Sequence, residues 1–232
     1  MTINNLPVVT KPVRIPIDGW FLSGDLSVPL HANGIIVFAH GSGSSRHSPR
    51  NQYVARYLEQ EGFATLLIDM LTDDEEKIDL RTGHFRFDIA LLAQRLVGII
   101  DWLATQPDVA SLPVGLFGAS TGGGAALSAA AARPRRVAAV VSRGGRPDMA
   151  GRALRHVSAA TLLIVGGDDA QVIELNRGAM AQMHGSVSLE IVPGATHLFE
   201  EPGTLEAVAA LAARWFQQHA ASRHRSEASR AV

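Results

Sequence analysis

Residues 112–132 have the sequence LPVGLFGASTGGGAALSAAAA and place Ser120 between two segments of different character. The apolar run 112–117 is typical of a buried β-strand, and the alanine-rich run 125–132 is typical of a helix. Between them, residues 118–122 match the pattern G-x-S-x-G, in which a sharp turn exposes a serine hydroxyl above a parallel sheet. The stretch therefore predicts a nucleophilic serine. The alternative is that this serine only caps the helix that follows it.

The rest of the chain alternates apolar strands with helical segments. Strands are expected at 12–17, 20–28, 34–39, 63–68, 112–117, 137–141, 161–165 and 187–192. Further helices are expected at 51–60, 87–103, 171–183 and 203–218. This alternation predicts an α/β fold with a doubly wound, mostly parallel sheet. Asp18-Gly19 between the first two strands adds an N-terminal antiparallel hairpin. The polar residues 70–86 are expected to form a solvated loop.

Length and composition predict one domain over residues 1–220, followed by a polar tail at 221–232. A hydrophobic content of 47% in 232 residues is ample for a single core. The stretch between Ser142 and Ala160 has room for one short helix but not for a large lid domain.

Charge and composition exclude several classes of protein. The net charge of −1 includes no basic stripe, so no nucleic-acid partner is expected. No apolar stretch approaches the ~20 residues of a membrane span, and residues 1–7 lack the features of a signal peptide, so the expected location is cytoplasmic. The absence of cysteine excludes thiolate metal sites and disulfides, and the histidines show no metal-binding spacing. Neither a metal nor a cofactor is expected.

Carboxylate and imidazole side chains follow two of the expected strands. Asp168 and Asp169 come after the strand at 161–165, and His197 comes after the next one. Ligands bind beyond the carboxyl ends of the strands in such a sheet, which is also where Ser120 lies. A serine hydroxyl is a weak nucleophile, so it needs a histidine to take its proton and a carboxylate to orient that histidine. The three positions together predict a catalytic triad.

Four motifs, in their order and spacing, resemble the α/β-hydrolase superfamily and, within it, the compact dienelactone hydrolase-like proteins. They are His40-Gly41-Ser42-Gly43, Gly118-x-Ser120-x-Gly122, Gly166-x-x-Asp169-x-x-Val172 and Gly194-x-x-His197. The resemblance covers roughly residues 11–219 and implies hydrolysis of carboxylic esters or lactones through an acyl-enzyme, without a cofactor. The dienelactone hydrolases proper use a cysteine nucleophile, so serine at position 120 favours a general carboxylesterase.

The resemblance also suggests roles for individual residues. It implies an oxyanion hole formed by the backbone N–H groups of Ser42 and Thr121. The motif spacing favours Asp169 as the acid. Asp168 is then a turn residue or a helix cap, and Asp148 is a distant third candidate for the acid that orients His197. His40 is expected to be structural.

Two arginines near the expected site have two interpretations. Arg46 lies in the loop after Gly41, and Arg143 leaves the strand at 137–141. Each could form an ion pair with an aspartate such as Asp69 or Asp148, or could bind a substrate carboxylate.

The sequence leaves three functions open. The first is a serine hydrolase acting on a small soluble ester, lactone or thioester. The second is a hydrolase-fold protein that binds a ligand or partner and turns over little. The third is an acyltransferase or perhydrolase that passes the acyl group to an alcohol or a peroxide. A homodimer is compatible with each of them.

Overall fold

A computed structural model describes residues 8–228, with side chains to residue 219. The segment 1–7, which bears on the signal-peptide prediction, and residues 229–232 of the expected tail lie outside the described residues. Among the described residues, no helix combines the length and the apolarity that crossing a bilayer requires.

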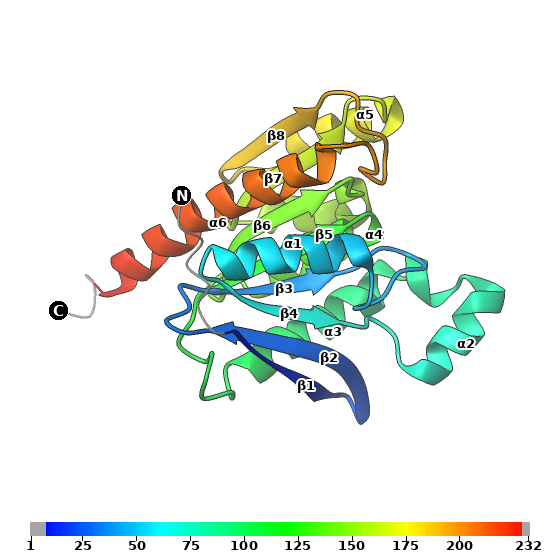
Figure 1. Ribbon diagram of the computed structural model, residues 1–232. Coiled ribbons are helices and arrows are strands. Elements are labelled where there is room, and N and C mark those ends of the chain that lie inside the picture. The colour runs from blue at the N-terminus through cyan, green and yellow to red at the C-terminus, as the bar shows by residue number, and fades with distance from the viewer. Residues whose placement is uncertain (1–7, 229–232) are drawn as a thin grey trace.

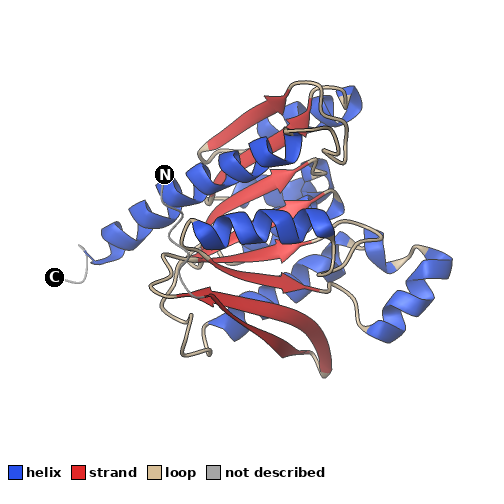
Figure 2. Cartoon of the chain, in the orientation of Figure 1, coloured by secondary structure: helices blue, strands red, loops and turns tan. Residues whose placement is uncertain are grey.

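An eight-stranded sheet forms the centre of the molecule (Figures 1 and 2). The strands are β1 (Val8–Ile17), β2 (Trp20–Pro29), β3 (Ile35–Ala39), β4 (Ala64–Ile68), β5 (Val114–Ala119), β6 (Val137–Arg143), β7 (Ala160–Gly166) and β8 (Val187–Val192). Their order across the sheet is β1-β2-β4-β3-β5-β6-β7-β8. Strand β2 runs antiparallel to both β1 and β4, and all other pairs are parallel. This arrangement confirms the predicted doubly wound sheet with an N-terminal hairpin.

Helices cover both faces of the sheet. The helical elements are α1 (Pro49–Gln60), α2 (Asp73–Thr82), η1 (Phe85–Phe87), α3 (Ile89–Leu103), α4 (Thr121–Ala132), η2 (Pro147–His156), α5 (Ala170–Met180) and α6 (Thr204–Ala228). Helices α1 and α6 pack on one face, and α3 and α4 pack on the other (Figure 1). Strand β3 shows why both faces need cover. Val37 points into the α3–α4 core and Phe38 into the α1–α6 core, as alternation along a strand requires.

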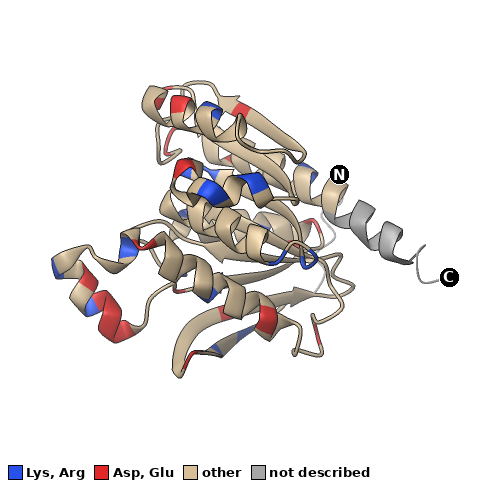
Figure 3. Ribbon diagram, turned by 180° about the vertical axis from the view of Figure 1, so that it is seen from behind, with Lys and Arg blue, Asp and Glu red and all other residues tan. Residues whose placement is uncertain are grey.

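The predicted loop at 70–86 is wrong, because this segment contains helix α2. Thr72 and Glu75 form a capping box, each side chain bonding the other's backbone N–H. All four residues of the first turn are acidic, which favours a helix N-terminus. In Figure 3 the acidic turns of the α2 ribbon are red, at the outer edge of the molecule. The run of charge that suggested a loop therefore stabilises a helix.

Two element ends also differ from the prediction. Strand β6 continues to Arg143, so this residue ends the strand rather than leaving it. Helix α6 continues past residue 218 to Ala228, into the expected tail, because no glycine or proline after Gly203 ends it. Between β6 and β7 the chain forms only η2, as expected from the short connection.

Candidate active site

Ser120 lies in a strained turn between β5 and α4. Its backbone has φ 50° and ψ −121°, a region that residues with a side chain rarely adopt. A Cβ on Gly118 would lie 2.5 Å from the Gly122 carbonyl oxygen, and one on Gly122 would lie 2.1 Å from that of Ala39. Only glycine fits at these two positions. Ser120 occupies the N-cap position of α4, but its side chain makes no capping hydrogen bond, so the helix-cap interpretation is wrong.

Asp169 and His197 form a hydrogen-bonded pair. Asp169 follows β7, His197 follows β8, and Nδ1 of the histidine lies 2.7 Å from Oδ2 of the aspartate. Because a carboxylate can only accept, Nδ1 carries the proton, and Nε2 is left able to take one. The Asp169 side chain is largely buried, with 16% of its surface exposed, whereas Asp168 is exposed and has no bond to the histidine.

Asp148 is engaged elsewhere. Its two carboxylate oxygens accept hydrogen bonds from Arg146 at 2.8 and 2.7 Å. The third candidate for the acid is therefore part of a separate ion pair.

A cavity of about 590 Å³ brings together residues from distant parts of the chain. Ser120, His197 and Arg143 line it, and so does the loop from Gly41 to Ser45. The N–H of Ser42, in that loop, makes no hydrogen bond to any described residue. The N–H of Thr121 is at the first position of α4, where a helix offers no partner. Both predicted oxyanion donors are thus available, and their role stays a prediction.

The two candidate arginines have different surroundings. Arg46 donates its backbone N–H to Asp69 at 2.8 Å, and its guanidinium pairs with Asp69 and with Asp25. It does not line the cavity, so the ion-pair interpretation holds for Arg46. Arg143 is 7% exposed and has no carboxylate partner among the described residues. Its guanidinium lies 5.9 Å from the ring centroid of Phe199.

Sequence reasoning missed two charged residues of the cavity, Arg50 and Glu76. Arg50 is in the first turn of α1, directly after the loop that begins at His40. This position in the sequence was the only indication that Arg50 lies at the site. Glu76 lies in α2, within the segment expected to be a loop, so no helix face could be assigned to it.

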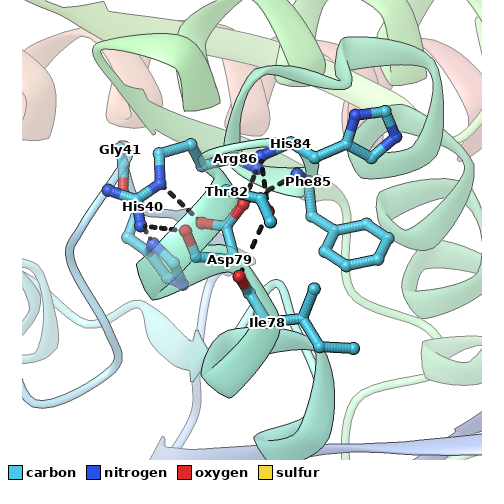
Figure 4. Close-up of polar contacts among 8 residues, drawn as sticks. All are labelled: His40, Gly41, Ile78, Asp79, Thr82, His84, Phe85 and Arg86. Carbon is cyan, nitrogen blue, oxygen red and sulfur yellow. Dashed lines mark hydrogen bonds and ion pairs between the residues drawn. The ribbon is translucent and has the colours of Figure 1, made fainter.

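A smaller cavity of about 70 Å³ is also lined by the Gly41–Ser45 loop. Ser42 lines both cavities, whereas Thr121 lines the smaller one. Of the residues drawn in Figure 4, its wall includes His40, Gly41, Asp79 and Arg86. His40 donates from Nδ1 to the Gly41 carbonyl at 2.9 Å and accepts the Met70 N–H at Nε2, at 3.0 Å. Burial lowers the pKa of His40, in keeping with this neutral form. These bonds agree with the structural role expected for His40.

Asp79 joins the end of α2 to η1 across the same cavity (Figure 4). Its carboxylate accepts the Phe85 N–H at 2.7 Å, the Arg86 N–H at 3.1 Å and Nε of Arg86 at 2.5 Å. Burial acts to raise the pKa of Asp79, but the hydrogen bonds from Arg86 and Phe85 outweigh it and hold the pKa below its usual value.

Replacing Asp79 is expected to destabilise the protein. Asp79→Ala leaves the Arg86 charge and two N–H groups without their acceptor, so the free energy of unfolding should fall by about 2 kcal/mol. Urea denaturation measures this, with Asp74→Ala as the control, since Asp74 pairs with Lys77 in the same helix but is exposed. A carboxyl group with a lowered pKa stabilises the fold only when ionised, so the difference from wild type should narrow as the pH falls below about 4. Equal losses in the two variants would contradict this role.

Within the described part of the chain, no three His, Asp or Glu side chains are grouped so that they could hold a metal ion.

A family model and a solved structure show the family of this chain. The model of the "Dienelactone hydrolase family" matches residues 22–222. A dienelactone hydrolase from Anabaena variabilis is 60% identical in sequence, with a TM-score of 0.90 over 92% of this chain and 99% of that one. Est1E from Butyrivibrio proteoclasticus shares the fold, with a TM-score of 0.75 over 90% of this chain and 98% of its own, at 17% identity.

Two curated relatives come from strains of Mycobacterium tuberculosis. Each is 62% identical over 212 residues, which is 91% of this chain and 45% of the relative, and each carries the name "Putative phosphoribosyl transferase". The chain thus spans about half the length of these relatives. The matched family model covers most of the chain, and the Anabaena structure agrees with it in sequence and in fold. The chain belongs to the dienelactone hydrolase family.

Proposed function

We propose that this protein is a serine hydrolase that cleaves small carboxylic esters or lactones through an acyl-enzyme. The observation that carries the proposal is the 2.7 Å bond between Asp169 and His197, since His197 lines the same cavity as the strained Ser120. Family membership supports hydrolase activity in general, and the arrangement of these three residues supports acyl chemistry in particular.

The proposed reaction has two halves. Oγ of Ser120 attacks the substrate carbonyl carbon while Nε2 of His197 takes the hydroxyl proton. The N–H groups of Ser42 and Thr121 stabilise the negative oxygen of the tetrahedral intermediate. The C–O bond to the leaving group then breaks, and His197 returns the proton to that oxygen. Water repeats the sequence on the acyl-enzyme and releases the acid.

The alternatives have less support. A binding protein has no need of a strained serine beside a histidine held by a carboxylate. An acyltransferase or perhydrolase uses the same residues and differs only in the acceptor. The names of the mycobacterial relatives mention phosphoribosyl transfer. This chain covers only 45% of those proteins, so the name describes proteins about twice as long.

The direct test is labelling with a fluorophosphonate, followed by peptide mapping and a panel of esters. We expect one label, on Ser120, and release of free acid from short esters in water. Labelling elsewhere, or none, would contradict the proposal. Adding an alcohol or a peroxide to the assay and quantifying the acylated product separates hydrolysis from acyl transfer.

The structure also predicts which esters are cleaved. The connection between β6 and β7 contains only η2, so no lid domain covers the cavity from there. We expect short, water-soluble acyl esters to be preferred, with no activation at a lipid interface. Rates measured across the solubility limit of a butyrate ester should show no jump at that limit. A sharp rise there would contradict an open site.

A further inference from the structure

Arg143 is a buried charge next to the proposed nucleophile. It ends β6, pairs in register with Ala119, and lines the same cavity as Ser120 and His197. Its Nε is buried without a hydrogen-bond partner, and burial, together with the charge of Arg50, lowers its pKa to about 10. Arg143 therefore remains charged at neutral pH. A buried charge without a counter-ion is costly, so a fold keeps one where something else supplies the counter-charge.

Two other arginines do have carboxylate partners. Arg46 has Asp69 and Asp25 as partners, and Arg146 has Asp148. The fold thus supplies a carboxylate partner to each of these two arginines, and none to Arg143 among the described residues.

Arg50 brings a second positive charge to the cavity. It lines the wall from the first turn of α1, and its Nε is also buried without a hydrogen-bond partner. Its other contact is an ion pair with Glu200 at 2.9 Å, and Glu200 is 61% exposed, so this pair contributes little. Two arginines, from two different elements, therefore bring positive charge to one cavity, and neither has a buried carboxylate partner among the described residues.

The rest of the cavity also favours an anion. The loop before α1 contributes hydroxyl groups to the lining, from Ser42, Ser44, Ser45 and Ser48. The positive end of the α1 dipole lies at the same wall, since Pro49 begins that helix and lines the cavity. Among the described residues of the lining, Glu76 is the only one with a carboxylate, and it is exposed on α2.

We propose that the substrate carries a phosphate group, which Arg143 and Arg50 bind while Ser120 attacks the ester or lactone bond. This assignment of a substrate class rests on the proposed serine hydrolase function. A phosphate monoester bears a charge of about −1.5 to −2 at neutral pH and three acceptor oxygens in different directions. Two guanidiniums from separate elements match that charge and shape, whereas a carboxylate offers one charge and two oxygens in one plane. The carboxylate expected from the sequence is the alternative that the experiment must separate.

Three acetate esters of similar length provide the kinetic test. They are 2-acetoxyethyl phosphate, 4-acetoxybutanoate and the neutral 2-methoxyethyl acetate. We expect kcat/KM for the phosphate ester to exceed that of the neutral ester by at least about tenfold, mainly through KM, because charge-assisted hydrogen bonds are made on binding. In Arg143→Met the ratio of kcat/KM for the phosphate ester to kcat/KM for the neutral ester should fall to about one. Arg50→Met, at a more exposed position, should lower the ratio as well and provides a second variant if the first does not fold.

Arg133→Gln is the matched control, because this arginine pairs with Asp101 at the far end of α4 and should keep the wild-type ratio. A preference for 4-acetoxybutanoate over the phosphate ester would overturn the proposal in favour of a carboxylate. Equal kcat/KM for charged and neutral esters would overturn any anion subsite.

A binding experiment separates failure of this proposal from failure of the proposed function. Calorimetry with 2-hydroxyethyl phosphate uses the Ser120→Ala protein, which needs no turnover. We expect saturable binding that weakens at least tenfold when Arg143→Met is added. If no ester is cleaved but this binding is observed, the hydrolase function fails and the phosphate subsite stands. Binding that is absent, or that Arg143→Met leaves unchanged, overturns the subsite whatever the esterase result.

Discussion

Ser120→Ala is expected to abolish ester hydrolysis and fluorophosphonate labelling while the protein keeps its fold. The hydroxyl oxygen is the atom that forms the acyl bond, so no other group can replace it, and a loss of about 10⁶-fold in kcat is expected. The hydroxyl makes no capping hydrogen bond to α4, so its removal should cost little stability. Steady-state kinetics on the best short ester, mass spectrometry of the labelled protein and a thermal melt measure the three properties.

His197→Ala supplies the companion measurement. We expect a comparable loss in kcat, and the double variant should be no worse than either single one, because the two residues act as a unit. Residual labelling of the Ser120→Ala protein, or additive losses in the double variant, would show that the nucleophile lies elsewhere.

Asp169→Asn is expected to lower kcat by about 10⁴-fold, because the amide keeps the shape of the carboxylate but stabilises the wrong imidazole tautomer. Asp168→Asn is the matched control, one residue away and exposed. It should leave both kcat and the melting temperature close to wild type. The Asp169→Asn protein should also melt near the wild-type temperature, which would show that its loss of kcat does not come from unfolding. If Asp168→Asn were inactive and Asp169→Asn active, Asp168 rather than Asp169 would be the acid, against the 2.7 Å bond between Asp169 and His197.

The parts of the fold that sequence predicted well are those with a strong local signal. Strands β3 and β7 are buried apolar runs, and their limits agree with the prediction to within one or two residues. The turn at Ser120 was predictable because close backbone approaches permit only glycine at Gly118 and Gly122. Motif spacing favoured Asp169 over Asp168, and Asp169 is the aspartate that the structure places in hydrogen-bond contact with His197.

The errors have a different physical origin. Helix α2 was missed because its acidic first turn is hydrophilic, as a solvated loop is. The turn is helical because Thr72 and Glu75 form a capping box, a specific pair of hydrogen bonds that the overall composition of the segment does not reveal. The two interpretations of Arg46 and Arg143 could not be separated, because the position of Asp69 beside one of them depends on how β3 and β4 are paired. Arg50 carried no motif, and only the direction of α1 brings it to the cavity.

The backbone of Ser120 has a consequence for how such a protein can evolve. A positive φ at a residue with a side chain costs stability, of the order of 1–3 kcal/mol, which glycine at the same place would largely avoid. Most substitutions that relieve strain are neutral for function, but at this position the stabilising replacement removes the hydroxyl proposed as the nucleophile. Selection for thermal tolerance alone would therefore favour glycine at this position, at the expense of the proposed nucleophile.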